Sequence, residues 1–137
     1  MQNIYYLDTS IWIDIHLKRG HNGEAAKKLM EKIILGNHLV LYSDSVVTEF
    51  KKLGLQEHEI HQLLSIAKPD NIKRTSATKR EIEEAKRLAM QRDVPMRDAL
   101  HAVIARNHGT QLVSRDRHFD RLRDITKAKL PENLLNA

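Results

Sequence analysis

Four carboxylates occupy positions at which this chain could assemble a reactive site, and two of them follow predicted strands. Asp8 comes directly after the apolar run at 4–7, and Asp116 comes two residues after a second run at 111–114. Short apolar runs of this kind are typical of buried strands in a parallel sheet. Because the ends of such strands line the binding crevice of an open α/β sheet, we expect Asp8 and Asp116 to face one edge.

The other two carboxylates, Asp98 and Glu49, fall on predicted helices. Asp98 opens an almost wholly apolar helix at 96–107 and shares a helix face with Ala102, whose small side chain allows close approach of the sheet. Its carboxylate is therefore expected to point inward. Glu49 lies one turn into its helix, on the flank of an apolar stripe that includes Phe50. This placement predicts a carboxylate at the boundary between core and solvent.

These acids admit a structural and a chemical interpretation. Aspartate is a favoured N-cap, so Asp8, Asp98 and Asp116 could each simply begin a helix, and Glu49 could be a surface residue. Several acids at one sheet edge, however, repel one another and raise one another's pKa unless a cation neutralises them. A divalent metal accounts for such a gathering. The chemistry it supplies is phosphodiester hydrolysis, in which one ion activates water and a second, where present, stabilises the leaving oxygen.

Composition restricts both the metal and the fold. The 137 residues include no cysteine, which excludes a disulfide framework, a thiolate zinc site, an iron–sulfur cluster and a cysteine nucleophile. All-oxygen ligands suit Mg²⁺ or Mn²⁺. With 41% hydrophobic and 30% charged residues, the chain is typical of one soluble globular domain spanning 1–137.

Predicted strands and helices alternate along the chain. Strands are expected at 4–7, 39–42, 71–75 and 111–114, with a last one at 125–129. Helices are expected at 10–17, 22–35, 44–53, 57–67, 78–92 and 96–107, with a loop or short helix at 116–122. Because parallel neighbours need crossover connections, which are usually helical, this order predicts a three-layer α/β/α sandwich with a central, mostly parallel sheet.

The net charge of +5 favours an anionic partner, nucleic acid first. Most of the excess lies at 97–129, where eight Lys and Arg accompany four Asp. Arg97, Arg115 and Arg117 flank the acids, where they either hold phosphates or form a solvated basic edge. No run approaches the roughly 20 apolar residues that span a bilayer, and no secretory signal is recognisable, so a cytoplasmic protein is expected.

Four segments together resemble the PIN-domain nucleases, and most closely the VapC-like toxins of type II toxin–antitoxin pairs. They are Tyr6-Leu7-Asp8-Thr9-Ser10, Thr48-Glu49-Phe50, Arg97-Asp98-Ala99-Leu100-His101-Ala102 and Leu112-Val113-Ser114-Arg115-Asp116-Arg117-His118-Phe119. The resemblance implies an endoribonuclease acting on RNA. It further implies that Mg²⁺ or Mn²⁺ is held by Asp8, Glu49, Asp98 and Asp116, and that Thr9 or Ser10 supplies a hydroxyl beside the first acid.

The resemblance also implies partners, and the sequence departs from the family at one position. Toxins of this family act with an antitoxin that blocks the site, frequently by inserting a basic side chain, and they tend to form homodimers. Family members often carry a further acid two residues beyond the fourth. In this chain that position is His118, with Asp120 further on, so the number of metal ions is left open.

Other histidines offer further candidates. His58 and His61 stand at i, i+3 and could bind zinc, but no third ligand is nearby and their helix has an ordinary amphipathic pattern. His101, one turn after the third acid, either contacts the site or packs beside a core helix.

Other interpretations concern the apolar residues and the class of function. The stretch after the first strand exceeds one helix face and is either core or an exposed dimer patch; it contains Ile11, Trp12, Ile13 and Ile15. Two alternatives to a ribonuclease stay open: a catalytically silent PIN-like module that binds RNA, and a receiver-like domain whose aspartate accepts a phosphoryl group. The presence of all four acids disfavours the first. The second needs paired acids after the first strand, whereas Asp8 is followed by Thr9.

Overall fold

The computed structural model describes residues 2–135 and centres on one parallel sheet. Its strands are β1 (Ile4–Leu7), β2 (Leu39–Ser43), β3 (Ile72–Thr75) and β4 (Gln111–Val113). They lie in the order β3-β2-β1-β4, and all three neighbouring pairs are parallel. The four strands expected at these places are thus confirmed to within one residue at each end.

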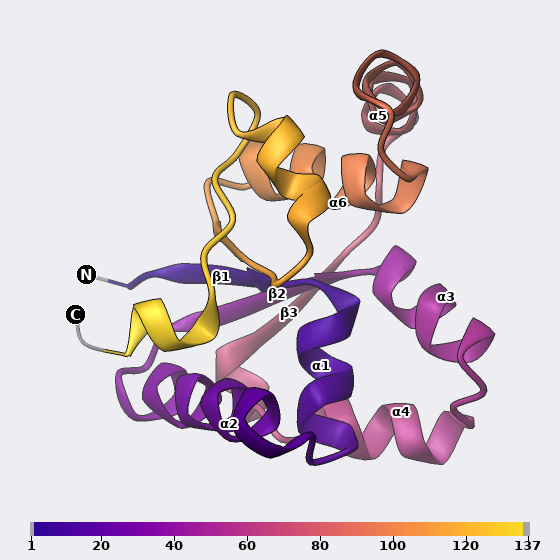
Figure 1. The fold of residues 1–137 in the computed structure, drawn as a ribbon. Coiled ribbons are helices and arrows are strands. Elements are labelled where there is room, and N and C mark those ends of the chain that lie inside the picture. The colour runs from indigo at the N-terminus through magenta and orange to yellow at the C-terminus, as the bar shows by residue number, and fades with distance from the viewer. Residues whose placement is uncertain (1, 136–137) are drawn as a thin grey trace.

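Helices cover both faces of the sheet, as Figure 1 shows. One layer contains α1 (Thr9–His16), α2 (Gly20–Leu35), α3 (Asp44–Lys52) and α4 (Glu57–Leu64). The other contains α5 (Lys79–Arg92), α6 (Met96–Asn107) and the 3₁₀ helix η2 (Arg117–Leu122). Two more 3₁₀ helices are η1 (Pro69–Asn71) and η3 (Pro131–Leu134). The three-layer α/β/α sandwich is therefore confirmed. Within residues 2–135, no helix combines the length and the hydropathy needed to cross a membrane.

Alternating side chains of β1 build a separate core on each face of the sheet. Tyr5 and Leu7 pack with the layer of α1 to α4, whereas Tyr6, between them, packs with α5 and α6. Because both faces are covered, the strand reads as a continuous apolar run rather than as an alternation of apolar and polar residues.

The strand order places a switch point between β1 and β4. From β1 the chain adds β2 and then β3 on one side, and it later returns to place β4 on the other side of β1. Ligands of open α/β sheets bind beyond the carboxyl ends of the strands at such a point. The N–H of Asp8 donates to the carbonyl of Val113 at 3.1 Å, which keeps the segments that follow β1 and β4 together.

The strand expected at 125–129 is wrong. Lys129 alone forms a bridge, to Val113 of β4, and residues 125–128 have no strand pairing. Pro131 follows two residues later and begins η3. Because proline lacks the N–H that a longer ladder needs, the pairing cannot extend in that direction.

The apolar stretch after β1 belongs to the core, so its interpretation as an exposed dimer patch is wrong. Ile11 and Trp12 are fully buried, and Ile13 and Ile15 are 6% and 9% exposed. The reason is that α1 packs against β1, α2 and α3 together, which leaves its apolar residues no solvent-facing side.

Candidate functional site

All four predicted carboxylates line one hollow beyond the carboxyl end of the sheet. The hollow has a volume of about 890 Å³, and its wall includes Asp8, Glu49, Asp98 and Asp116. They come from the end of β1, from α3, from α6 and from the turn that follows β4. The switch point of the sheet thus gathers acids that are far apart in the sequence.

Asp8 begins α1 and is held by three donors. Its Oδ1 accepts from the Ser10 hydroxyl at 2.7 Å and from the Ile11 N–H at 3.2 Å, and its Oδ2 accepts from the Ser114 hydroxyl. The same Ser114 oxygen accepts the N–H of Asp116 at 3.0 Å, which links the ends of β1 and β4. Burial nevertheless raises the pKa of the Asp8 carboxyl. Asp8 is therefore both an N-cap and a residue of the hollow.

Asp98 is not a cap. It is the third residue of α6, after the N-cap Pro95, and it is 4% exposed. Burial, and after it the negative charge of Asp116, raises the pKa of Asp98 to about 6, although Arg97 acts in the opposite direction. A bound cation stabilises the ionised form of a buried carboxylate against both burial and the repulsion of a second carboxylate beside it.

His118 contacts both of these aspartates, and the interpretation of the sequence did not include it in the site. Its Nδ1 lies 3.0 Å from Oδ2 of Asp98 and 2.9 Å from Oδ1 of Asp116. Asp116 begins η2 by accepting the backbone N–H of His118 at 2.9 Å, and this turn holds the ring beside Asp98. The available signal was the spacing, since His118 stands where the resembled family often has a further acid.

Within residues 2–135, Asp98, Asp116 and His118 are the one group of three such side chains whose ligand atoms all lie within 4.8 Å of one another. Asp8 and Glu49 line the same hollow but lie outside this group. The exposed His58 and His61 of α4 are also outside it. Among the described residues, no third side chain joins these two histidines to complete a zinc site.

Glu49 is held by a buried chain of hydrogen bonds. Its Oε1 lies 2.7 Å from Nε2 of His101, which is 1% exposed. The Nδ1 of His101 lies 2.6 Å from the Tyr6 hydroxyl, which lies 2.7 Å from the hydroxyl of Ser43. Burial raises the pKa of Tyr6 far above its usual value, so its hydroxyl stays protonated within this chain of hydrogen bonds. His101 then donates from Nε2 to Glu49.

The effect of this chain on Glu49 is electrostatic as well as geometric. Burial works to raise the pKa of Glu49, but the hydrogen bond and the charge of His101 outweigh it, so the pKa lies below its ordinary value. Both roles considered for His101 are therefore present, because the ring is buried beside the core and also contacts a carboxylate of the hollow.

The two hydroxyls that follow Asp8 differ in their partners. Ser10 donates to Asp8. Thr9 lines the hollow at 6% exposure, and its Oγ1 makes no hydrogen bond of ordinary geometry with the described residues, although it lies close enough to Glu49 to lower the pKa of that carboxyl. Because buried polar atoms are nearly always paired, an unpaired hydroxyl on this wall is available to a ligand. The orphaned hydroxyl and the uncompensated carboxylates fit a divalent cation with oxygen ligands, such as Mg²⁺ or Mn²⁺.

Of the three arginines expected near the acids, the structure brings one to the hollow. Arg97 is exposed and lines it, and Arg117 is exposed on η2 outside the lining. Arg115 is instead paired with Glu132, through two hydrogen bonds of 2.7 and 2.9 Å. Its guanidinium is therefore already engaged by a carboxylate.

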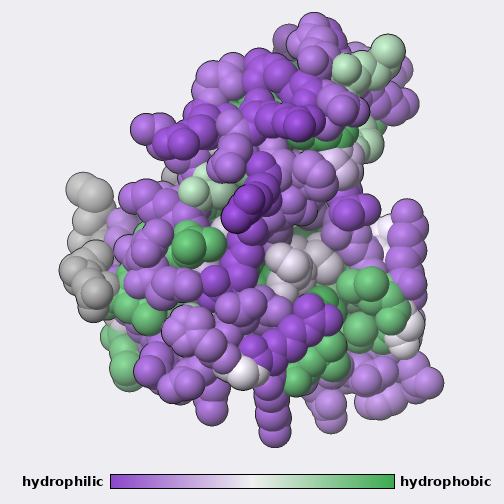
Figure 2. Space-filling view, in the orientation of Figure 1, coloured by the Kyte–Doolittle hydropathy of each residue, from purple (hydrophilic) through white to green (hydrophobic). Residues whose placement is uncertain are grey.

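The rest of the lining includes basic, polar and apolar side chains and one further acid, Asp44, which is paired with Arg74. Arg19 and Lys52 line the hollow, and the interpretation of the sequence missed both. The apolar lining includes Ile13, Leu53 and Met96. The face shown in Figure 2 is predominantly hydrophilic, with hydrophobic residues gathered beside α1 and α3. The wall of the hollow thus combines acids with cations that can bind phosphate groups.

Comparisons with known proteins agree with this architecture. A family model described as PIN domain matches residues 5–125. VapBC2 from Rickettsia felis, solved with a DNA fragment from its promoter, has a chain 16% identical with a TM-score of 0.70, covering 93% of this chain and 98% of that one.

Two further solved structures are similar. VapBC-1 from nontypeable Haemophilus influenzae is 19% identical with a TM-score of 0.66, covering 93% of this chain and 98% of that one. A toxin–antitoxin complex from Klebsiella pneumoniae is 21% identical with a TM-score of 0.64, covering 93% and 97%. At these identities the likeness shows a shared fold. No curated protein matches the chain.

Proposed function

The chain belongs to the PIN-domain family, and from that premise we propose that it is a metal-dependent endoribonuclease that hydrolyses RNA phosphodiester bonds. The observation that carries the proposal is the gathering of Asp8, Glu49, Asp98 and Asp116 around one hollow at the switch point of the sheet. Carboxylates gathered in one hollow, two of them with ligand atoms within 4.8 Å of each other, favour a bound divalent cation, and the basic residues beside them favour a polyanionic substrate.

In the proposed reaction the acids hold the metal, and Arg97 and Lys52 hold RNA phosphates. Asp8, Asp98 and Asp116 bind Mg²⁺ or Mn²⁺ directly, and Glu49 binds it directly or through water. The bound ion supplies an activated water and stabilises charge that develops on the phosphate.

Neighbouring groups prepare these ligands. Ser114 bonds to Asp8 and to the backbone of Asp116, which fixes two ligands relative to each other. His101 orients the Glu49 carboxylate and keeps it ionised. In this proposal the Thr9 hydroxyl, and Ser10 beside it, would contact the substrate.

The experiment that tests the proposal is cleavage of a mixed cellular RNA pool by the purified protein in Mg²⁺, Mn²⁺ and EDTA, with Asp98→Asn in parallel. We expect metal-dependent cutting by the wild type and a loss of at least about 100-fold in the variant, since one lost electrostatic group of this kind costs about 10²–10³ in rate. Cutting that persists in EDTA, or that survives the replacement of both Asp8 and Asp98, would contradict it. Tight RNA binding without cutting by either protein would instead support the silent RNA-binding module.

We further propose that the chain is the toxin of a toxin–antitoxin pair and that it forms a homodimer. Support for the first comes from the VapBC and toxin–antitoxin complexes among its structural neighbours. Co-expression with the product of an adjacent gene, followed by co-purification and an RNA cleavage assay, tests whether an antitoxin blocks the site. Sedimentation equilibrium of the purified chain tests the dimer, which must use a surface other than the buried stretch around Trp12.

A further inference from the structure

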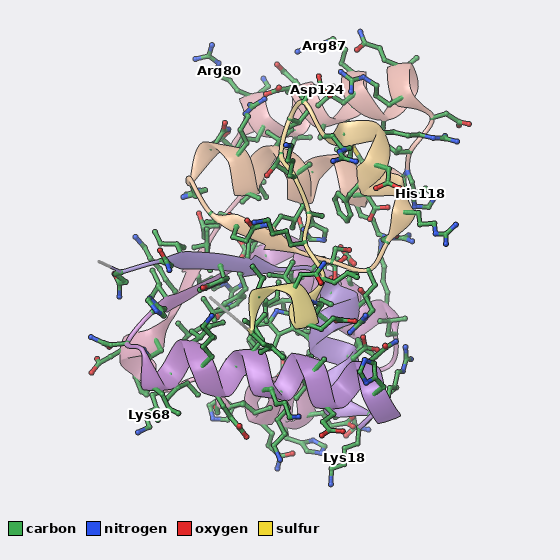
Figure 3. All side chains as sticks on the ribbon, turned by 60° about the vertical axis from the view of Figure 1, so that its left-hand side comes forward. Lys18, Lys68, Arg80, Arg87, His118 and Asp124 are labelled. Atoms are coloured by element: carbon green, nitrogen blue, oxygen red, sulfur yellow. The ribbon has the colours of Figure 1, made fainter. Side chains whose placement is uncertain are left out.

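His118 lies where a metal ligand would lie, although it is not an acid. The residue extends from η2, and it is labelled in Figure 3. Its side chain is 45% exposed, with Nδ1 directed at the two aspartates. The N–H of its own backbone donates to Asp116, so the ring is held in this place by the local turn.

The distances around Nδ1 match those between ligands of one ion. Two ligand atoms at right angles on an octahedral ion with bonds of about 2.1 Å lie about 3 Å apart. The Nδ1 of His118 lies 3.0 Å from Oδ2 of Asp98 and 2.9 Å from Oδ1 of Asp116. Both distances from Nδ1 are therefore those of neighbouring ligands on a single cation, and ligand atoms of all three residues lie within 4.8 Å of one another.

A second observation at the same hollow points to a ligand. Thr9, 6% exposed, carries a hydroxyl oxygen without a partner among residues 2–135. The hollow thus contains carboxylates whose negative charge no cation neutralises in the described part of the chain, together with a buried hydroxyl that has no hydrogen-bond partner there. Both features favour a bound ligand.

We propose that His118 is a nitrogen ligand of the metal centre and that it makes this centre prefer Mn²⁺ to Mg²⁺. The inference rests on the proposed metal-dependent function and specifies its metal. Mg²⁺ binds oxygen ligands and gives up its water reluctantly, whereas imidazole suits first-row transition ions. Mn²⁺ accepts carboxylate and imidazole together, so replacing an acid by a histidine lowers the affinity for Mg²⁺ more than that for Mn²⁺.

The direct test is spectroscopy of Mn²⁺ bound to the full chain. Electron spin echo envelope modulation detects an imidazole nitrogen bound to Mn²⁺, and it needs no substrate. We expect nitrogen modulation in the wild type and its loss in His118→Asp, which restores an acid at this position. The modulation persists in His108→Gln, an exposed histidine outside the hollow, and in His101→Gln, because both nitrogens of His101 already have partners.

Calorimetric titration of the metal-free proteins measures the preference itself. Loss of a residue that merely supports a ligand already costs about 10–100-fold in metal affinity. We therefore expect the ratio of the Mg²⁺ to the Mn²⁺ dissociation constant to fall at least about tenfold in His118→Asp. Circular dichroism checks that the variant is folded, and His118→Asn, which also lacks the ring, replaces it if it is not.

The outcomes separate this inference from the proposed function. Mn²⁺ bound by the wild type without nitrogen modulation, or modulation retained in the folded variant, overturns the role of His118 and leaves the metal-dependent ribonuclease intact. An unchanged preference between the two ions overturns the selectivity. A wild type that binds neither ion, or that cuts RNA equally well in EDTA, overturns the proposed function and the inference with it.

Discussion

The two halves of the hollow differ in how many hydrogen-bond donors meet their carboxylates. In the β1 half, which comprises Asp8 and Glu49 with the side chains bonded to them, hydrogen-bond donors are already in place. Asp8 accepts from two hydroxyls and one backbone N–H, and Glu49 is bonded by His101. In the η2 half, which comprises Asp98 and Asp116 of the lining and the adjacent His118, two carboxylates lie against one imidazole nitrogen.

This difference indicates which half is complete before a ligand arrives. Preformed donors fix the carboxylates of the β1 half in a single geometry, which is the arrangement that favours catalysis without reorganisation. The η2 half has fewer donors, and burial together with the negative charge of Asp116 raises the pKa of Asp98 to about 6; burial raises the pKa of Asp8 as well, against three donors. The ionised form of Asp98 therefore lowers the stability of the fold until a cation binds. Functional sites commonly have a stability cost of this kind.

The largest effect on stability is expected from neutralising Asp98. Its pKa of about 6 in the fold lies above the ordinary 3.8. The ionised carboxylate therefore destabilises the protein fully above pH 6, and this cost disappears as the pH falls from about 6 to about 4. Asp98→Asn should raise the free energy of unfolding at pH 7.5 by up to about 3 kcal/mol in EDTA, with no gain at pH 4. Urea denaturation across this pH range measures it.

Ser114→Ala is the matched variant in the β1 half, and it should act with the opposite sign. Ser114 is 4% exposed, and its loss removes a donor from Asp8 and an acceptor from the N–H of Asp116. The unpaired groups should lower the free energy of unfolding by about 1–3 kcal/mol. If both variants change stability in the same direction, the two halves are not balanced differently, and the comparison fails.

Sequence patterns predicted the fold and the four acids because both depend on local rules. The apolar runs that flank Asp8 and Asp116 identified the strands, and the carboxyl ends of parallel strands necessarily meet at one edge. The inward face of the helix at 96–107 likewise identified Asp98 as buried. Capping propensity alone would have been ambiguous, since Asp8 and Asp116 do begin helices and Asp98 does not.

What the sequence could not predict depends on contacts between distant side chains. Arg115 stands beside Asp116 in the sequence, yet Glu132 of η3 engages its guanidinium. His101 reaches Glu49 only because α3 and α6 border the same hollow. The apolar stretch around Trp12 exceeds one helix face because α1 is enclosed on several sides, and composition does not distinguish this from an exposed patch.

A smaller effect, on catalysis, is expected from His101, a positioning residue of the β1 half. In His101→Leu the Glu49 carboxylate loses its bonded partner, and kcat should fall about tenfold with KM for RNA unchanged. Burial is then opposed only by Thr9 and by the charge of Arg97, so the pKa of Glu49 rises and the acid limb of the pH–rate profile moves to higher pH. His101→Gln keeps a donor toward Glu49 and should recover most of the rate. If kcat falls only as much as the lower thermal stability explains, and the pH–rate profile does not shift, His101 has a structural role in the core and does not position Glu49.

The smallest effect is expected on RNA binding, where the same contrast between free and paired charge separates two arginines. Arg97 lines the hollow and is exposed, whereas Arg115 is paired with Glu132. In an Asp98→Asn background that does not cut, Arg97→Gln should weaken single-stranded RNA binding a few-fold and reduce the slope of log K against log salt by about 0.7, the contribution of one phosphate contact. Arg115→Gln should leave both unchanged. Fluorescence anisotropy at several KCl concentrations measures the two slopes. An equal loss of RNA affinity and of salt slope in the two variants would mean that RNA phosphate displaces Glu132 from Arg115. The ion pairs of the free protein would then not determine which arginines bind the substrate.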